Sequence, residues 1–403
     1  IPAHWEVKRL RHIFKEVSIK KCGNEQQLCA TQSYGVIPKK LYSYKTVEVI
    51  SGDLNSFKLV KKDNFVISLR SFEGGIEHSN YQGIISPAYT ILEPQVEIYS
   101  FYFKFLFKSS FFISTLNIHK IGIREGQNIS YASLQYTPIP LPPLQKQKEI
   151  AEFLDSKCEK IQNYIDKKQK LITLLQEKKQ ALINKVVTKG LNPNIESKNS
   201  GIEYLGLIPH HWEVKKLKHI CKINPQANET LPNNFVYIDL ESVIKGQLLK
   251  EQVINKEQAP SRAQRILQKQ DILFQLVRPY QRNNYIFNKN GDYVASTGYA
   301  QIRTKECVNF VYYALLENSF VERVILKSTG SNYPAITSND FADLKIPLPP
   351  LQEQKQIANF LDKKCEKINS VIEKTKKQIE LIKEYKNTLI NEAVCGRINL
   401  ERK

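Results

Sequence analysis

Two arginine-led loops hold the residues whose types and spacing best suit a chemical task. Their candidate residues are Arg70, Ser71 and Phe72 in the first loop, and Arg278, Tyr280, Gln281, Arg282 and Asn283 in the second. Guanidinium and amide groups make paired hydrogen bonds to the edges of guanine and adenine. Flanking glycines would let the backbone approach a ligand closely. The loops therefore predict contacts to bases, although a solvated side chain on a surface hairpin explains any single residue equally well.

A second polar and basic loop lies ahead of a Pro-Pro pair in each half of the chain. Its candidate residues are Lys120, Arg124 and Gln127 in the first half, and Asn332 and Tyr333 in the second. Short runs of this kind contact phosphate oxygens or base edges in nucleic-acid complexes. The motif is weak by itself, but its recurrence at equivalent positions favours a binding role.

Catalytic signatures are missing from the sequence. It carries none of the motifs GxGxxG, GxxxxGK[ST], HExxH or GxSxG, and no PD…(D/E)xK metal-binding arrangement can be placed on it. The Asn-Pro pairs at 192–193 and 224–225 lack the second proline and the aromatic residue of an adenine-methyltransferase motif. A repeated His-Trp pair suits packing better than catalysis. We therefore expect a binding protein with no catalytic residue, metal site or cofactor of its own.

The charge balance points to a polyanionic partner. Lys and Arg number 59 against 40 Asp and Glu, which gives a net charge of +19. Nucleic acid is the first candidate and an acidic membrane surface the second, while a merely lysine-rich surface is the alternative. Seven scattered cysteines without zinc-ligand spacing indicate a reducing cytoplasm. The most apolar stretch, Phe101–Ile113, is too short to span a bilayer, so no membrane partner is expected.

The elements that must position these loops come from a long internal repeat. Ile1–Leu10 returns at Ile208–Leu217, and Pro140–Gln145 returns at Pro347–Gln352, 207 residues later in both cases. Such a period is too long for a solenoid and indicates a duplicated domain. The expected segments are a recognition domain at 1–143, a helix at 144–190, a second recognition domain at 191–350 and a helix at 351–397. The second frame is preceded by SGIEYLG, so we expect a short segment ahead of Ile1 as well.

Both helical segments carry a coiled-coil seam whose positions alternate four and three residues apart. The two seams are Leu154, Cys158, Ile161, Ile165, Lys168, Ile172, Leu175, Lys179, Leu182 and Val186, and Leu361, Cys365, Ile368, Ile372, Thr375, Ile379, Ile382, Lys386, Leu389 and Ala393. Antiparallel pairing of the two helices is expected, with separate dimerisation arms as the alternative. A second apolar row is expected to be exposed and to bind partner subunits: Leu174, Ile183, Val187, Leu381, Ile390 and Val394.

The two non-helical segments are faintly alike. Asp63–Arg70 aligns with Asp271–Arg278, and Phe101–Phe111 aligns with Phe310–Phe320. They read as mixed strand, loop and short helix that share a fold and differ in surface. The expected fold class is α+β, with two mixed α/β recognition domains separated by two long antiparallel helices and related by a pseudo-twofold repeat.

The whole chain resembles the specificity subunit of type I restriction–modification enzymes. The resemblance rests on IPxHWEVKxLxHI at 1–13 and 208–220, and on PLPPLQxQKxIAxFLDxKCEKI at 140–161 and 347–368. It implies two target recognition domains, each reading one half of a bipartite sequence of double-stranded DNA through the major groove. The helices would fix the gap between the half-sites.

The resemblance also implies partners that carry the chemistry. Two methylation subunits, which use S-adenosylmethionine, would dock on the helices, and two motor-nuclease restriction subunits would use ATP and magnesium. A coiled-coil scaffold whose variable segments bind protein remains an alternative, and acidic or neutral loops at 70–75 and 278–285 would favour it. A self-sufficient restriction or methylating enzyme would need a cofactor pocket beside two recognition domains.

Overall fold

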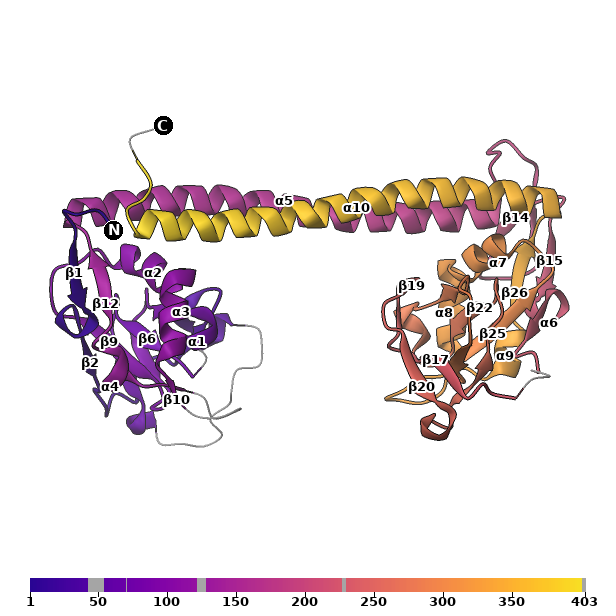
Figure 1. Ribbon diagram of the computed structural model, residues 1–403. Helices are drawn as coiled ribbons and strands as arrows, with labels where there is room; N and C mark the ends of the chain where they lie inside the picture. The colour runs from indigo at the N-terminus through magenta and orange to yellow at the C-terminus, as the bar shows by residue number, and fades with distance from the viewer. Residues whose placement is uncertain (43–53, 70, 122–127, 227–229, 401–403) are drawn as a thin grey trace. The chain divides into compact units, whose positions relative to one another are not determined.

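The computed structural model describes residues 1–42, 54–69, 71–121, 128–226 and 230–400. The chain divides into two compact units, each of which takes part of both long helices. Unit 1 comprises Ile1–Gln169 and Lys376–Lys403, and unit 2 comprises Lys170–Thr375 (Figure 1). Because the units cut across both helices, the expected four-segment boundaries stay a prediction.

The long helices are α5 (Leu144–Lys189) and α10 (Leu351–Val394), and each begins directly after a Pro-Pro pair. A buried glutamine secures each start. The side chain of Gln147 donates to the Pro142 carbonyl at 2.9 Å and accepts from the Tyr99 N–H at 2.9 Å. The side chain of Gln354 repeats this with the Pro349 carbonyl at 2.9 Å and the Cys307 N–H at 3.1 Å. The glutamine of the repeated motif thus ties each helix to its own recognition domain.

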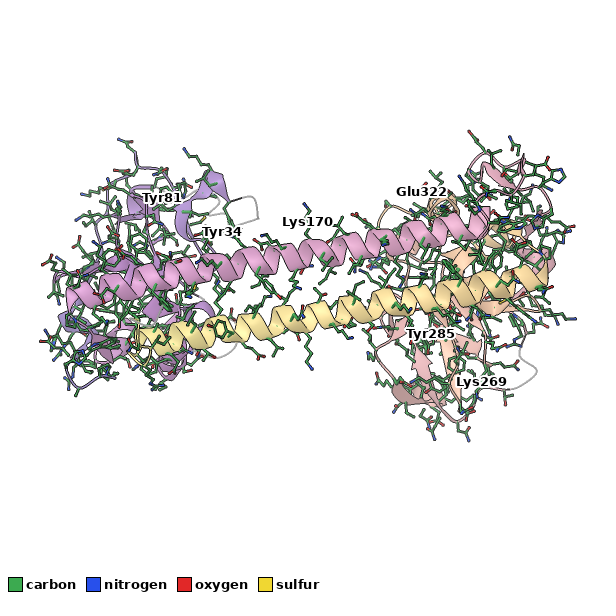
Figure 2. All side chains as sticks on the ribbon, turned by 90° about the horizontal axis from the view of Figure 1, so that it is seen from above. Tyr34, Tyr81, Lys170, Lys269, Tyr285 and Glu322 are labelled. Carbon is green, nitrogen blue, oxygen red and sulfur yellow. The ribbon has the colours of Figure 1, made fainter. Side chains whose placement is uncertain are left out.

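The two helices pair antiparallel within each unit (Figure 1; Figure 2), and every expected seam residue is buried or half-buried. In unit 2 the Lys179 ammonium donates to Asn369 Oδ1 at 2.9 Å. In unit 1 Lys386, the repeat equivalent of Lys179, lies close enough to the Cys158 thiol to lower its pKa, although burial raises that pKa more. The expected antiparallel helix pair is confirmed.

The expectation of a fully exposed second apolar row is wrong for four of its six residues. Ile183 and Val187 are buried in the core of unit 2 together with Trp212. Ile390 and Val394 are buried in unit 1, where the Tyr102 hydroxyl donates to the Val394 carbonyl at 2.9 Å. The cause is that the C-terminal end of each helix packs against the recognition domain of the other half of the chain, α5 in unit 2 and α10 in unit 1. Only Leu174 and Leu381 remain exposed.

Unit 1 holds a four-stranded sheet in the order β2-β9-β6-β7, and β1 pairs antiparallel with β12. Its strands and short helices are β1 (Glu6–Arg9), β2 (Phe14–Val17), β3 (Leu28–Thr31), β4 (Gly35–Pro38), β5 (Lys58–Val60), β6 (Phe65–Ile67), α1 (Ser71–Gly74), β7 (Glu77–His78), β8 (Gly83–Ile85), β9 (Thr90–Pro94), α2 (Ser100–Lys108), α3 (Ser110–Ile118), β10 (Lys120–Ile121), β11 (Asn128–Ile129), α4 (Tyr131–Leu134) and β12 (Pro138–Leu141). The fully buried Phe14 packs edge-on against Phe65 and Phe103, so the sheet and α2 share one aromatic core.

Unit 2 holds sheets in the orders β16-β25-β22-β23 and β20-β17-β24-β21, and β15 pairs antiparallel with β26. Its strands and short helices are β13 (Ser197–Asn199), β14 (Leu207–Pro209), β15 (Glu213–Lys216), α6 (Leu217–Ile220), β16 (Cys221–Ile223), β17 (Asn234–Ile238), β18 (Val243–Ile244), β19 (Gln247–Leu248), β20 (Gln252–Asn255), β21 (Ala263–Ile266), β22 (Ile272–Gln275), β23 (Tyr285–Ile286), β24 (Tyr293–Ser296), β25 (Tyr299–Thr304), α7 (Val308–Leu315), α8 (Asn318–Leu326), α9 (Ser338–Ala342) and β26 (Lys345–Leu348).

One four-stranded sheet of each recognition fold corresponds strand by strand, whereas the second four-stranded sheet of unit 2 has no counterpart of that size in the described part of unit 1. The strand β6 lies between β9 and β7, and β22 lies between β25 and β23 in the same way. Both strands fall in the aligned segments 63–70 and 271–278, and a pair of short helices follows each sheet (α2–α3 and α7–α8). The expectation of two repeated domains with mixed helix and sheet is therefore confirmed. In the part of the chain that the structure describes, no helix is long and apolar enough to cross a membrane.

Candidate nucleic-acid interface

A buried glutamine at the end of β22 organises the loop 278–285 of unit 2. Gln275 is 1% exposed, and its backbone N–H donates to Asn284 Oδ1 at 2.8 Å. Its side-chain amide donates to Gln281 Oε1 at 2.8 Å, and its Oε1 accepts from the Asn283 N–H at 3.2 Å. These hydrogen bonds hold the loop against the end of β22, although Asn284 Nδ2 has no partner among the described residues. The sequence reasoning missed Gln275, whose only signal is an amide within the apolar run ILFQLV.

The two loops that the sequence singled out in the second half meet at Arg278. Its backbone N–H donates to the Pro334 carbonyl at 2.7 Å, and the neighbouring Val277 forms a β-bridge with Ala335. The Arg278 guanidinium lies over the Tyr333 ring, 4.2 Å from its centroid. Arg278 has φ 55° and ψ 53°, a left-handed conformation that costs a non-glycine residue about 1–2 kcal/mol. Tyr333 is 65% exposed, so this pair lies at the surface.

The other predicted side chains of unit 2 differ in their contacts and exposure. Arg282 Nη1 donates to Asn318 Oδ1 at 2.7 Å, and burial lowers the pKa of its guanidinium, opposed by the nearby carboxylates of Glu317 and Glu322. Asn283 Oδ1 accepts from the Lys245 N–H at 3.1 Å. By contrast, the side chains of Tyr280, Gln281 and Asn332 are exposed. All these residues stay predictions as DNA contacts.

In unit 1 the loop after β6 turns directly into the short helix α1. Ser71 is buried, and its Oγ accepts from the Ser68 N–H at 2.8 Å. Phe72 is half-buried, and its carbonyl accepts from Asn117 Nδ2 at 3.1 Å. Three predicted residues lie outside the described residues, namely Arg70, Arg124 and Gln127, and of Lys120 only the backbone is described, in β10. The DNA contacts predicted for this unit therefore also stay predictions.

Gly75, at the end of this loop, packs closely against the backbone of α2. It has φ +84°, and a Cβ added there would lie 2.1 Å from the Phe107 carbonyl oxygen. No side chain fits at that distance, so only glycine is compatible with this turn. Its close approach is to the backbone of α2, which accounts for the glycine without any ligand.

A buried carboxylate lies beneath the same loop. Glu77 is 2% exposed and forms an ion pair with the Lys108 ammonium, while its Oε2 has no hydrogen-bond partner among the described residues. Burial raises the pKa of Glu77 to about 7, although Lys108 opposes the shift. The adjacent His78 lies 3.0 Å from Asp63 Oδ1, and burial lowers the pKa of its imidazole. The Glu77 carboxyl group, which lies next to this loop, therefore changes its charge near neutral pH.

Exposed tyrosines lie beside these loops, and the two in unit 1 were missed by the sequence reasoning. Tyr34 is 67% exposed and Tyr81 is 37% exposed in unit 1 (Figure 2). A β-bridge between Val36 and Ser79 brings their segments together. In unit 2, Tyr280 is 51% exposed. Exposed tyrosines in turns are the available sequence signal, and such rings provide stacking surfaces for bases.

Among the residues that the structure describes, no group of three or more His, Cys, Asp and Glu side chains is arranged to hold a metal ion. A pocket of about 320 Å³ in unit 1 is lined by Gln26, Gln27, Pro38, Lys39 and Lys40. Two lysines and two amides in its wall suit an anion or another hydrogen-bonding group rather than a metal.

A family model described as the type I restriction modification DNA specificity domain matches residues 2–176 and 209–381. The chain belongs to this family. The specificity-subunit resemblance seen in the repeated motifs is thereby confirmed, and each DNA specificity domain takes in one of the two recognition folds together with a large part of the helix that follows it.

Relatives and solved structures agree with this membership. The MjaVIII specificity subunit of Methanocaldococcus jannaschii is 25% identical over all of this chain and 94% of its own length. The MjaX specificity subunit of the same organism is 26% identical over all of this chain and 95% of its own. A chain solved for the assembly of the type I R-M system has a TM-score of 0.74 at 15% identity, covering 99% of both chains. The HsdS subunit of Thermoanaerobacter tengcongensis has a TM-score of 0.55 at 16% identity, covering 99% of this chain and 98% of its own.

Proposed function

We propose that this chain is the non-catalytic DNA-reading subunit of a type I restriction–modification complex, in which each unit reads one half of a bipartite target. The observation that carries the proposal is the pair of equivalent strands β6 and β22, which present loops of different composition from the same place in one fold. A shared scaffold with unlike loops is what two readers of unlike sequences require.

The charges of the second loop support DNA as the ligand. Residues 278–285 include Arg278 and Arg282 but no acidic residue, and the whole chain carries a net charge of +19. Neutral or acidic loops at 70–75 and 278–285 would favour a protein scaffold. The loop 278–285 is basic, whereas 70–75, with Arg70 and Glu73, is neutral overall, so the charge of the unit 2 loop is the one that favours DNA. Because cationic contacts release counterions from DNA, we expect the affinity to fall steeply as salt rises.

The helices are proposed to set the gap between half-sites and to dock two methylation subunits. In support, α5 and α10 each run unbroken through parts of both units. Six apolar side chains stay exposed at repeat-equivalent helix positions: Leu144, Leu351, Tyr164, Val371, Leu174 and Leu381. Equivalent apolar patches suit two copies of one partner. S-adenosylmethionine, ATP and magnesium would then act in the methylation subunits and in two motor-nuclease restriction subunits, not in this chain.

A domain exchange tests the proposal. Residues 1–143 are replaced by the corresponding segment of a family member with a different target, and the chain is assembled with its methylation partner. We expect one half of the recognised sequence to change, while the other half and the gap are kept. A change in both halves would refute independent readers, and binding without any sequence preference would refute the DNA-reading function itself.

A further inference from the structure

The loop 278–285 of unit 2 contains a guanidinium, that of Arg278, which is supported by an aromatic ring but has no carboxylate partner among the described residues. The Arg278 Nε is buried, and its guanidinium makes no hydrogen bond or ion pair with any residue that the structure describes. The Tyr333 ring supports it at 4.2 Å. Arg282, in the same loop, donates to Asn318 and lies near two carboxylates. Of the two arginines in this loop, Arg278 is therefore the one whose outer donors are free for a ligand among the described residues.

The backbone around Arg278 is fixed from several directions. Its N–H binds the Pro334 carbonyl at 2.7 Å, and its own carbonyl accepts from the Gln281 N–H at 3.0 Å, which closes the short helix η6 (Pro279–Gln281). Its left-handed conformation persists ahead of a proline, although proline disfavours helical conformations in the residue before it. Strain of this kind is maintained where the surroundings over-determine it, and it concentrates at binding sites.

We infer that Arg278 reads a guanine of the half-site bound by unit 2, with Tyr333 as its positioning residue, an inference that rests on the proposed function. A guanidinium stacked on a ring has a fixed plane, and guanine presents O6 and N7 in the major groove as a matching pair of acceptors. A guanidinium can also bind a phosphate in a bidentate manner, but a phosphate contact carries no base preference, so varying each base pair separates the two cases.

Gln275 is a second positioning residue for Arg278. It binds Gln281 and Asn283, which lie on either side of Arg282 in the loop that starts at Arg278. The tight turn 329–335 is closed by two hydrogen bonds of 2.9 Å between Thr329 and Ala335, and it holds Tyr333. The loop that carries Arg278 and the turn that carries Tyr333 are therefore ordered before DNA binds. This lowers the conformational entropy that is lost on binding.

The test uses the full chain assembled with its methylation partner, and a set of duplexes in which each position of the target found by methylation sequencing is varied in turn. The variants are Arg278→Lys, which keeps the charge but loses the planar fork, Arg278→Ala, Tyr333→Phe and Tyr333→Leu. Lys327→Ala is the matched control for a phosphate contact, because Lys327 is exposed and lies just before the turn that holds Tyr333.

We expect both Arg278 variants to lose about 10- to 100-fold in affinity for the target and to lose the preference for guanine at one position of one half-site. Tyr333→Leu reduces the same preference, whereas Tyr333→Phe keeps it. Lys327→Ala weakens all duplexes alike and makes the salt dependence shallower.

A uniform loss across all duplexes for Arg278→Lys would overturn the inference by making Arg278 a phosphate contact. Unchanged affinity and preference would overturn it as well. Failure of the proposed function has a different signature, because the wild-type assembly itself would then show no sequence preference.

Discussion

Units 1 and 2 each bury a polar side chain beneath the loop that follows the equivalent strand, but the two side chains differ in chemistry. Glu77 begins β7, and Asn284 directly precedes β23, the strand in the same place of the second sheet. Each leaves one polar atom without a hydrogen-bond partner among the described residues, Oε2 of Glu77 and Nδ2 of Asn284. Glu77 pairs with a lysine, whereas Asn284 joins a network of neutral amides.

The shared fold thus determines the position of the buried side chain that anchors each loop, but not whether that side chain is a carboxylate or an amide. A carboxylate with a raised pKa makes the anchor of unit 1 sensitive to pH, and amides make the anchor of unit 2 insensitive to it. The chain offers a convenient reporter for each unit, because its two tryptophans are Trp5 in unit 1 and Trp212 in unit 2. Replacing either one by phenylalanine leaves the fluorescence of the other to follow a single unit during unfolding in urea.

The largest expected effect comes from Gly75→Ala in the loop of unit 1. The new Cβ would meet the Phe107 carbonyl oxygen at 2.1 Å, so we expect a loss of more than about 4 kcal/mol in the unfolding free energy of unit 1. Gly201→Ala is the control, since Gly201 also has positive φ but nothing within 4 Å, and it should cost about 1–2 kcal/mol. Equal costs would show that Gly75 is not closely packed.

Next in size is Lys108→Met, which leaves Glu77 buried without its cation. We expect unit 1 to lose about 3–5 kcal/mol of unfolding free energy at pH 8, because an unpaired buried charge is strongly destabilising. At pH 5 the loss should be much smaller, since Glu77 then takes up a proton. The Trp5 signal in urea at both pH values measures this, and equal losses would contradict the pairing.

Glu77→Gln isolates the titration itself. Burial raises the folded-state pKa of Glu77 to about 7, above the ordinary glutamate value of 4.5, so the folded unit binds the extra proton. Its contribution to stability is complete below pH 4.5 and is lost as the pH rises through 7. The His78 pKa is lowered, which gives the opposite slope in part of this range. Relative to the variant, wild-type unit 1 should therefore lose on the order of 2 kcal/mol between pH 5 and pH 8. A constant difference would refute the raised pKa.

The smallest expected effect is that of Gln275→Leu in unit 2. Leucine fills the same space but removes the hydrogen bonds to Gln281 and Asn283, at a cost of about 1–2 kcal/mol. Because only neutral amides are involved, the Trp212 signal should report the same cost at pH 5 and pH 8. A cost that varied with pH would break the contrast between the two anchors.

The helices and the repeated frame could be predicted from the sequence because their signals are local. The seam spacing and the Pro-Pro pairs predicted the bounds of α5 and α10 to within a few residues. The alignment of 63–70 with 271–278 predicted the equivalent strands β6 and β22. What the pattern could not show is that the C-terminal end of each helix packs against the recognition domain of the other half of the chain. Ile183 and Val394 therefore appeared free for partners, although both are buried within their own units.

The candidate site was predictable only in part, since its contacts join distant residues. Arg278 and Tyr333 were both selected from sequence, but only the bridge between Val277 and Ala335 brings them together. Gln275 looked like an ordinary strand residue because nothing local reveals a hydrogen-bond network. Ser71 was selected for its place after an arginine, and the turn into α1 buries its hydroxyl.

The central claim is that two units of one fold read two different halves of a DNA target. Single-molecule methylation sequencing of random DNA exposed to the assembled enzyme tests it most directly. The account predicts methylated sites made of two specific blocks, unlike one another, separated by a gap of constant length and no preferred sequence. A single continuous block, or two blocks whose separation varies freely, would contradict it.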